Sequence, residues 1–528
     1  MRHEAQANDS DHEQASLTPP RSRGRWRISF SVALLLFIGI CAINGARHSL
    51  NALPRGVDVT GQVTTLPADD IRFLTDLTHA DAYGRPLVEQ QIFDHVLKII
   101  GNANDFLVLD FFLFNHQSGA LAPGQVYRPL SSQLRDALIA RKEAVPALRV
   151  LLVTDPINDV YGGDPSADLR ALRAAGIDVI LTDLDRLRDS NPLYSGFWRT
   201  VIDWWAGDGS GPGWLPNPLE GGPSRVTFRA WARLLNFKAN HRKLVIGDDG
   251  AGKLVGIVTS ANPHDASSAH SNVAIQLSGD ALRPLLQSEI EIARFSGWRG
   301  NLRPYEAADD RQPPEPLGAL PSITPAAPIY ATAQALTEGA IKAAVLQRLA
   351  ATEAHDSIDV AMFYLADRAI IEALLQAAAR GVEIRVILDP NKDAFGRTKS
   401  GIPNRPVASE LVAASDGAIK IRWYRTHGEQ FHVKLLVIKH AASLWFTLGS
   451  ANFTRRNLNN FNLEANVAIE VPTRAPLAEH VTGYFDRLWS NRDAPDSEYT
   501  ADYPTWADPA QSSYWLYRLM EGSGVSTF

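Results

Sequence analysis

The chain carries two copies of one short pattern, and this duplication constrains its fold more than any other feature. In each copy a histidine and a lysine lie two residues apart within an apolar run: Asn240-His241-Arg242-Lys243-Leu244-Val245-Ile246-Gly247-Asp248 and Phe431-His432-Val433-Lys434-Leu435-Leu436-Val437-Ile438. Side chains of a strand alternate between its faces, so both groups of a copy can share one face. A neutral imidazole beside an ammonium suits attack on an anionic phosphate, because one group makes the bond and the other holds the charge.

A short polar cluster follows each copy of the pattern. The first copy is followed by Thr259-Ser260-Ala261-Asn262 and the second by Gly449-Ser450-Ala451-Asn452. Hydroxyl and amide groups can donate hydrogen bonds to phosphate oxygens. We therefore expect four residues to bind the substrate phosphate: Ser260, Asn262, Ser450 and Asn452.

Further repeats indicate two halves with one plan. An apolar run before the first motif ends in Asp155-Pro156-Ile157-Asn158-Asp159-Val160-Tyr161-Gly162, and its counterpart ends in Asp389-Pro390-Asn391-Lys392-Asp393-Ala394-Phe395-Gly396. The acidic residues of this repeat are interpreted as turn and cap residues rather than metal ligands. Short apolar strands alternating with helical segments predict α/β halves with parallel or mixed sheets covered on both faces.

The domain organisation follows from composition and from the repeat. We expect the following order: a disordered cytoplasmic tail at 1–27, a transmembrane anchor at 28–46, a linker at 47–84, a first lobe at 85–298, a proline-rich linker at 299–328, a second lobe at 329–492, and a C-terminal tail with a docking helix at 493–528. The first lobe contains a tryptophan-rich insert at about 185–235. Two interpretations of this insert stay open: an added helix packed on the lobe, or an aromatic element that reaches a lipid interface.

The anchor is predicted from an uncharged run. Residues 28–46 (ISFSVALLLFIGICAINGA) would span roughly 28 Å as a helix, about one hydrocarbon thickness. Four arginines precede the run closely: Arg21, Arg23, Arg25 and Arg27. The positive-inside rule then places the N-terminus in the cytoplasm and the lobes outside it. A cleaved signal peptide is the alternative. The single cysteine, Cys41, lies in the run, so no disulfide is expected in the lobes.

The duplicated H-x-K-x4-D…(G/S)-S-x-N plan resembles the phospholipase D superfamily. In particular, Asn240-His241-Arg242-Lys243 resembles the first motif of bacterial cardiolipin synthases and related phosphatidyltransferases. The resemblance covers most of residues 85–490. It implies two phospholipase D-type α/β/α sandwich lobes that meet at one active site, and a reaction that needs no metal or organic cofactor.

The resemblance also implies roles for individual residues. It makes His241 the nucleophile and His432 the general acid and base, with Lys243 and Lys434 neutralising the phosphate. The swapped assignment of the two histidines stays open.

The two copies depart from the family pattern in different places. Asp248 completes the first motif, whereas Lys439 occupies the position where the family has aspartate in the second. In the first polar cluster Thr259 replaces the usual glycine. Alignment of the closing strands gives Glu464 as the acid that hydrogen-bonds a catalytic imidazole, with His270 as its first-half counterpart.

These features together predict a membrane-anchored enzyme that cleaves or transfers phospholipid phosphodiesters through a phosphohistidine. Water or an alcohol such as glycerol or phosphatidylglycerol would accept the phosphatidyl group. The expected location is a bacterial-type inner membrane, with one span and an extracytoplasmic catalytic region. A phospholipase D-fold nuclease is the first alternative, disfavoured by the net charge of -6. A non-catalytic phosphodiester-binding membrane protein is the second, favoured by Lys439 and His270.

Overall fold

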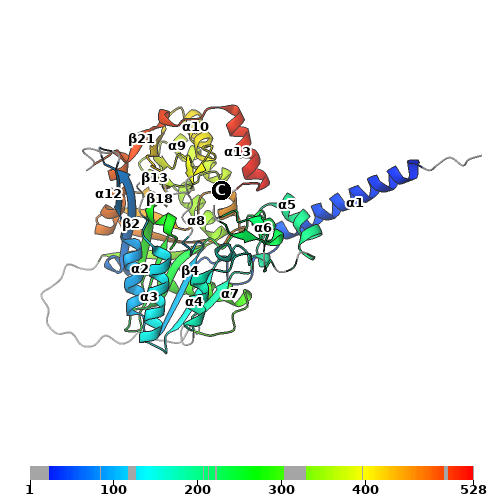
Figure 1. Cartoon of the computed structure of the whole chain (residues 1–528). Coiled ribbons are helices and arrows are strands. Elements are labelled where there is room, and N and C mark those ends of the chain that lie inside the picture. Colours follow the sequence, from blue (N-terminus) through cyan, green and yellow to red (C-terminus); the bar gives the residue numbers. More distant parts are fainter. Residues whose placement is uncertain are drawn as a thin grey trace, which may run out of the picture.

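Two lobes, each built on a large mixed sheet, form the body of the protein, and one long helix leaves it (Figure 1). The computed structural model describes residues 23–81, 83, 85–116, 127–205, 207, 209–211, 213–219, 223–302, 329–394, 397–492, 498–526 and 528. Most of the predicted tail at 1–27 and of the predicted linker at 299–328 lies outside these residues. The predicted α/β fold with two similar lobes and an N-terminal apolar helix is confirmed.

The first lobe contains an eight-stranded sheet in the order β3-β2-β11-β10-β9-β4-β5-β6. The three strands β4, β5 and β6 are parallel, and the remaining pairs are antiparallel. Every residue of β4 is buried, as expected for a strand covered on both faces. The strands are β2 (Ile71–Ala80), β3 (Pro86–Glu89), β4 (Phe106–Phe111), β5 (Arg149–Thr154), β6 (Asp178–Leu181), β9 (Lys243–Asp248), β10 (Leu254–Thr259) and β11 (Asn272–Ser278), and the main helices are α2 (Ile92–Asn102), α3 (Leu130–Ala144), α4 (Ala167–Ala174) and α7 (Arg283–Phe295).

The second lobe repeats this plan in a nine-stranded sheet, β1-β12-β20-β19-β18-β13-β14-β17-β21. Here β13, β14 and β17 are the parallel strands. The strands are β1 (Thr64–Pro67), β12 (Tyr330–Thr337), β13 (Ser357–Met362), β14 (Glu383–Leu388), β17 (Ile419–Tyr424), β18 (Lys434–Lys439), β19 (Ser443–Gly449), β20 (Ala465–Pro472) and β21 (Thr500–Asp502), and the main helices are α8 (Gly339–Ala350), α9 (Arg368–Ala379), α10 (Asn404–Ala414) and α12 (Pro476–Trp489).

The two lobes share one hydrophobic core. Val273 and Ile275 of β11 belong to the same cluster of buried side chains as Leu448 of β19 and Ile469 of β20. A separate cluster packs α2, α3 and α4 on the first sheet, and another packs α8, α9 and α10 on the second. Because the shared core lies between the sheets, both lobes are held in one fixed arrangement.

The segment 47–84 is not the linker predicted from its sequence. Its residues 64–67 form β1, which pairs with β12 in the sheet of the second lobe. Its residues 71–80 form β2, which pairs with β11 in the first lobe. The first lobe therefore begins at Ile71 rather than at residue 85. Local sequence could not show this, because a four-residue strand gains its stability from a partner far along the chain.

The predicted C-terminal tail also joins the body. β21 pairs with β17 at the edge of the second sheet. Helix α13 (Gln511–Ser523) follows it and buries Tyr517, whose hydroxyl accepts a 2.8 Å hydrogen bond from Arg368 on α9. The docking helix is thus present, at the end of an ordered segment.

The long helix that leaves the body is α1 (Arg23–Ser49) (Figure 1). Its residues Phe30–Ser49 are long and apolar enough to cross a membrane, judged by length and composition. Its C-terminal part packs against the tryptophan-rich insert. The insert comprises α5 (Pro192–Phe197), a π-helical turn at Trp198–Ile202, β7 (Leu215–Pro216), β8 (Arg225–Val226) and α6 (Phe228–Leu234).

Candidate active site

The two motif histidines lie where each lobe reaches into the other. The backbone amide of His241 donates to the carbonyl of Leu463 at 2.9 Å, and that of His432 donates to the carbonyl of Ser271 at 2.9 Å. The residues directly before the histidines form isolated β-bridges with the same two segments. These reciprocal bridges bring both histidines to the wall of one cavity.

His241 of the first lobe pairs with Glu464 of the second lobe. Its Nδ1 lies 2.9 Å from Oε1 and 3.1 Å from Oε2 of the carboxylate. An ionised carboxylate only accepts hydrogen bonds, so Nδ1 carries the proton and Nε2 keeps its lone pair. Ser450 and Asn457 donate to the same carboxylate and fix its position. The predicted contact of Glu464 with a motif imidazole is thus present, and it crosses between the lobes.

His432 has an amide partner in the equivalent position. Its Nδ1 lies 3.2 Å from Oδ1 of Asn272. Ser260 donates to this oxygen at 2.9 Å, as Ser450 does to Glu464. The first-half counterpart of Glu464 is therefore Asn272, and the assignment of His270 to that role is wrong. The two candidates are two residues apart, and a shift of two keeps the same strand face, so the sequence pattern could not separate them.

The two motif lysines are buried beside the histidines. Lys243 donates to the carbonyl of His241 at 2.6 Å, and Lys434 donates to the carbonyl of His432 at 2.8 Å. Each ammonium also lies above a phenylalanine ring: Phe112 at 5.3 Å in the first lobe and Phe363 at 5.1 Å in the second. Burial lowers the pKa of Lys243 to about 7 and that of Lys434 well below its ordinary value, with Lys243 adding to the effect on Lys434. A bound anion favours the charged form of both lysines.

The four predicted phosphate-binding residues divide into two kinds. Ser260 and Ser450 bind the partners of the histidines, so their hydroxyls are engaged away from the cavity. Asn262 and Asn452 line the cavity. Oδ1 of Asn262 accepts from the amide of Leu113 at 3.2 Å, which leaves its NH₂ group to donate. The prediction of direct phosphate contact therefore fits the asparagines, whereas the serines hold Glu464 and Asn272 in place.

Asp248 does not join the site, contrary to the prediction. It ends β9, so it lies roughly 17 Å along the strand from Lys243. Its carboxylate accepts hydrogen bonds from the amides of Asn104, Asp105 and Phe106 at 2.8–3.2 Å. Despite burial these bonds lower the pKa of Asp248 below its ordinary value. Asp248 therefore fixes the start of β4, and its counterpart Lys439 is exposed at the end of β18.

The duplicated aspartates Asp155 and Asp389 act as caps, as predicted, and they also fix the motifs. Asp155 accepts from the amide of Ile157 within its own turn and from that of Asn240 at 2.7 Å. Asp389 accepts from the amide of Phe431 at 2.8 Å. Each thus holds the residue directly before a motif histidine.

The cavity has a volume of about 430 Å³ and is walled by both lobes and the insert. Besides the motif residues it contacts His270 and Arg456, and also three side chains that the sequence did not single out: Tyr364, Lys399 and Phe528. The ring of His270 lies 5.9 Å from that of His432. The insert adds an apolar wall of Pro218, Leu219, Leu234 and Phe237. Among the aromatic side chains of the cavity, Phe112 and Phe363 could be anticipated from the sequence, because both end the duplicated apolar runs.

The surroundings hold both imidazoles neutral. Burial lowers the pKa of His241 to about 4, with Lys243 acting in the same direction and Glu464 against it. Burial, Lys434 and His270 hold the pKa of His432 well below its ordinary value. A neutral imidazole has the lone pair that nucleophilic attack needs. A bound phosphodiester brings negative charge, which favours the protonated form of the second histidine.

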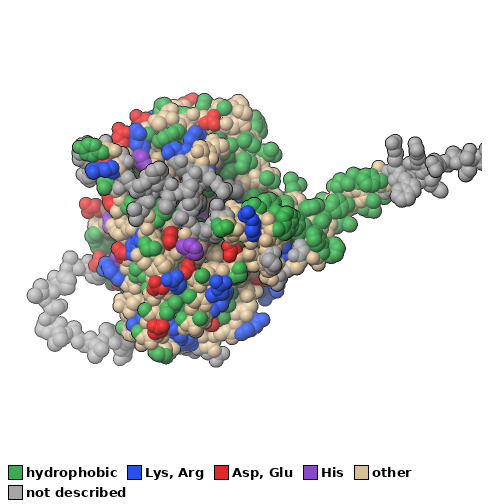
Figure 2. All heavy atoms as spheres, viewed as in Figure 1, with side chains coloured by type: hydrophobic (Ala, Val, Ile, Leu, Met, Phe, Trp, Pro, Cys, Tyr) green, Lys and Arg blue, Asp and Glu red, His purple; other side chains and the backbone are tan. Residues whose placement is uncertain are grey.

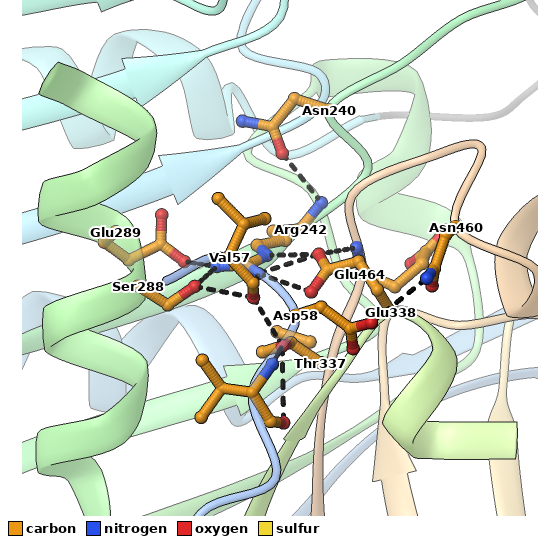
Figure 3. A network of polar contacts seen from close by, with 12 residues as sticks. Val57, Asp58, Asn240, Arg242, Ser288, Glu289, Thr337, Glu338, Asn460 and Glu464 are labelled. Carbon is orange, nitrogen blue, oxygen red and sulfur yellow. Dashed lines mark hydrogen bonds and ion pairs between the residues drawn. The ribbon is translucent and has the colours of Figure 1, made fainter. Parts of the chain in front are cut away.

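Arg242, between His241 and Lys243, is fully buried in a network that joins the lobes (Figure 3). Its guanidinium donates to Glu289 of α7 at 2.8 Å and to Glu338, directly before α8, at 2.7 Å. Glu338 also accepts from the backbone amide of Glu464 at 3.0 Å. Burial raises the pKa of Glu338 to about 7, against the lowering effect of Arg242. The network therefore connects the first motif to the carboxylate that orients it.

Comparisons with known proteins found a similar domain and a similar fold. Residues 347–489 match the family model described as "Cardiolipin synthase, PLD-like domain". The crystal structure of phosphatidylserine synthase from Haemophilus influenzae Rd KW20 is similar over 91% of this chain and 97% of that chain, with a TM-score of 0.52 and 10% identity. At this identity the likeness concerns the fold.

Two further solved structures are similar with lower scores. Polyphosphate kinase from Porphyromonas gingivalis has a TM-score of 0.37 and 12% identity, over 82% of this chain and 52% of that chain. The phospholipase D family member Nuc from Salmonella typhimurium has a TM-score of 0.25 and 20% identity, over 33% of this chain and 98% of that chain. No curated protein matches the sequence.

The duplicated lobes and the paired motifs resemble the plan of phospholipase D-type proteins. The family match over residues 347–489 and the similar fold agree with the resemblance to the phospholipase D superfamily that the sequence indicated. Its second lobe is similar to the PLD-like domain of cardiolipin synthases.

Proposed function

We infer that the protein is a membrane-anchored enzyme that transfers or hydrolyses phospholipid phosphodiesters through a phosphohistidine. The observation that carries this inference is the pair of His241 and Glu464 facing His432 across one cavity. A carboxylate-oriented imidazole with a free Nε2 is a nucleophile, and a second imidazole opposite it can handle the leaving group.

In the first step, Nε2 of His241 attacks phosphorus and the bond from phosphorus to the headgroup oxygen breaks. His432, protonated once the phosphate is bound, gives its proton to the departing alkoxide. Lys243 and Lys434 stabilise the added charge on the equatorial oxygens. The product is a free headgroup alcohol and a phosphatidyl group on His241.

In the second step, neutral His432 takes the proton of an incoming hydroxyl. The oxygen of that hydroxyl forms a bond to phosphorus while the bond from phosphorus to Nε2 of His241 breaks. Water as acceptor gives phosphatidate, and an alcohol such as glycerol or phosphatidylglycerol gives a new phosphodiester. Both histidines then return to their starting protonation states.

A phospholipid substrate is supported by three independent features. The insert gives the cavity an apolar wall beside the cationic site, which suits an acyl chain next to a phosphate. Helix α1 supplies a candidate membrane span. The second lobe is similar to the PLD-like domain of cardiolipin synthases, and the fold is similar to that of a phosphatidylserine synthase.

The arginines before the apolar run favour a cytoplasmic N-terminus and an extracytoplasmic catalytic body. The expected location is therefore the outer face of a bacterial-type inner membrane.

The direct test is to reconstitute the full chain in vesicles that contain phosphatidylglycerol. Release of glycerol with a diphosphatidyl lipid indicates transfer, and release of glycerol with phosphatidate indicates hydrolysis. The His241→Ala variant serves as the control for contaminating lipases. Cleavage of single-stranded DNA without any lipid product would instead establish a nuclease, and inactivity on both substrates would favour a binding protein.

A further inference from the structure

Helix α1 is held against the insert by two glycines that allow the backbones to touch. A Cβ atom at Gly45 would lie 2.3 Å from the carbonyl oxygen of Pro192, and one at Gly196 would lie 2.2 Å from that of Cys41. Asn44 donates to Thr200 at 3.0 Å across the same contact. The insert is therefore fixed along the C-terminal part of α1. If α1 spans a bilayer, the position of the helix also determines how deep the insert lies.

The contact extends to the middle of the apolar run. The ring of Phe37 on α1 lies 6.5 Å from that of Phe197 on α5. At 1.5 Å per residue, Phe37 is roughly 18 Å along the helix from Ser49, the end of the candidate span. A bilayer core needs about 20 apolar residues, and the arginines up to Arg27 prevent the span from shifting toward the N-terminus. Helix α5 must therefore reach the level of the hydrocarbon.

The exposed side chains of the insert fit that position. Leu193, Trp204 and Trp214 are 73%, 76% and 72% exposed. Figure 2 shows hydrophobic side chains along α1 that continue onto the region where it meets the body. Tryptophan is favoured at the boundary between headgroups and acyl chains, because its ring is apolar and its N–H polar.

The charged side chains of the same segment are neutralised within the protein. Residues 190–205 contain two, and both form ion pairs: Arg199 with Asp189 at 2.7 Å, and Asp203 with Arg229 at 2.8 Å. Paired charges lower the cost of bringing this segment to the bilayer. Helix α13 ends beside this segment, since Gly524 at its C-terminal end packs on the carbonyl of Ser190.

We propose that residues 190–205 of the insert, together with Trp214, are immersed in the outer half of the bilayer, and that the insert forms the entrance by which a phospholipid reaches the two histidines. Pro218 and Leu219, four and five residues after exposed Trp214, line the active-site cavity. An acyl chain can thus pass from the membrane to the cationic site along one apolar surface. The role as an entrance rests on the proposed phospholipid substrate, whereas the immersion rests on α1 alone.

The immersion is tested with single-cysteine labels on the full chain. Cys41 is the only native cysteine, so one substitution gives a cysteine-free background. In a Cys41→Ser background, an environment-sensitive fluorophore is attached at Leu193→Cys or Trp204→Cys, with Leu87→Cys on β3 as the exposed control. Both insert labels should be quenched by spin-labelled lipids in vesicles and shielded from iodide, and the control should show the reverse. Iodide quenching of both insert labels to the level of the control would overturn the proposal. This readout needs no turnover, so it stands apart from the proposed reaction.

The entrance is tested with the double variant Trp204→Ser/Trp214→Ser, and Tyr83→Ser is the matched exposed-aromatic control. Turnover of long-chain phosphatidylglycerol in vesicles should fall about tenfold, equivalent to about 1.4 kcal/mol. Turnover of a short-chain lipid dissolved as monomers should change less than about twofold, because it needs no transfer from a bilayer. Equal losses on both substrates, or none on either, would contradict the entrance role.

Discussion

The carboxylate of Glu464 lies 2.9 Å from Nδ1 of His241, although the two residues belong to different lobes. His432 has no carboxylate in the equivalent place, since Asn272 stands there at 3.2 Å. A carboxylate stabilises the positive charge that an imidazole gains when it bonds to phosphorus, and an amide does so less. This asymmetry supports His241 as the nucleophile and His432 as the acid and base.

Replacement of Glu464 by glutamine should remove most activity without unfolding the protein. The amide can present its NH₂ group to Nδ1, which moves the imidazole proton to Nε2 and removes the attacking lone pair. We expect kcat to fall roughly 10³- to 10⁴-fold, the loss typical of a triad carboxylate replaced by its amide. Glu470→Gln, on the strand β20 that directly follows Glu464 but paired with surface Arg348, should leave kcat unchanged. Steady-state kinetics on vesicles measures both, and a loss under tenfold for Glu464→Gln would refute the orienting role.

The two histidines should differ when the leaving group is changed. His432→Ala should lower turnover of phosphatidylglycerol by about 10²- to 10⁴-fold, because the headgroup alkoxide is no longer protonated. A nitrophenyl phosphatidyl ester needs no such proton, so this variant should release nitrophenol once and accumulate phosphohistidine. His241→Ala should form none. Acid-labile, alkali-stable phosphate on the protein is the measurement, and its appearance in His241→Ala alone would reverse the assignment.

The pH profile of kcat/KM should be bell-shaped. This parameter reports the pKa values of essential groups in the free enzyme. His241, with its pKa lowered to about 4, must be neutral, so activity falls as the pH drops through that value. Lys243, with its pKa lowered to about 7, and Lys434, with its pKa lowered well below its ordinary value, must both be charged, so activity falls as the pH rises and they lose their protons. Lys243→Arg should move the alkaline limb upward, because arginine stays charged above pH 12. An alkaline limb that does not move would show that Lys243 does not set it.

Asp248→Asn should affect stability rather than chemistry. The carboxylate holds three backbone amides at the start of β4 and none of the active site. We expect a loss of about 1–3 kcal/mol in the free energy of unfolding, because an amide cannot accept the same set of bonds. kcat at a permissive temperature should stay within about threefold of the original, as for any change outside the reacting groups. Denaturant unfolding is compared with Asp249→Asn, an exposed neighbour, and a selective loss of kcat in Asp248→Asn would restore the catalytic role.

Arg242→Met should destabilise the protein strongly, because it leaves Glu289 and Glu338 buried without a cation. The expected loss is about 3–5 kcal/mol, the usual cost of removing one partner of a buried ion pair. The added change Glu338→Gln should recover part of it, since a neutral amide tolerates burial better. Thermal unfolding measures the series, with Arg283→Met on the surface as control. The absence of any recovery in the double variant would contradict the pairing.

The sequence predicted the repeated fold and the motif residues because both depend on local patterns that occur twice. The alternation of side chains along a strand was enough to predict that His241 and Lys243, like their second copies, share one face. Asp248 was misplaced in the site because the motif spacing says nothing about which end of a strand faces the cavity. The serines were misread for a related reason: Ser450 follows its strand where predicted, but its hydroxyl binds Glu464.

Contacts between the lobes could not be derived from the sequence. The first motif has Arg242 at the position where the second motif has Val433. The ion pair of Arg242 with Glu338 becomes apparent only when the two lobes are placed together in the structure. The identity of the residue that bonds His432, Asn272 rather than His270, also depended on how the segments of the two lobes are aligned with each other. Residues such as Lys399 and Arg456, which reach the cavity from loops and short helices, carry no periodic signal at all.

The pairing of β1 with β12 has a consequence for biosynthesis. Thr64 and its partner Ala333 are about 270 residues apart, so β1 must wait for nearly the whole first lobe to be made before its neighbour exists. At about 5–20 residues per second the delay is on the order of 10–60 s. A chain interrupted before residue 330 would expose an unpaired strand that follows helix α1. The N-terminal strand thus makes assembly of the second sheet a late event that depends on completion of the chain.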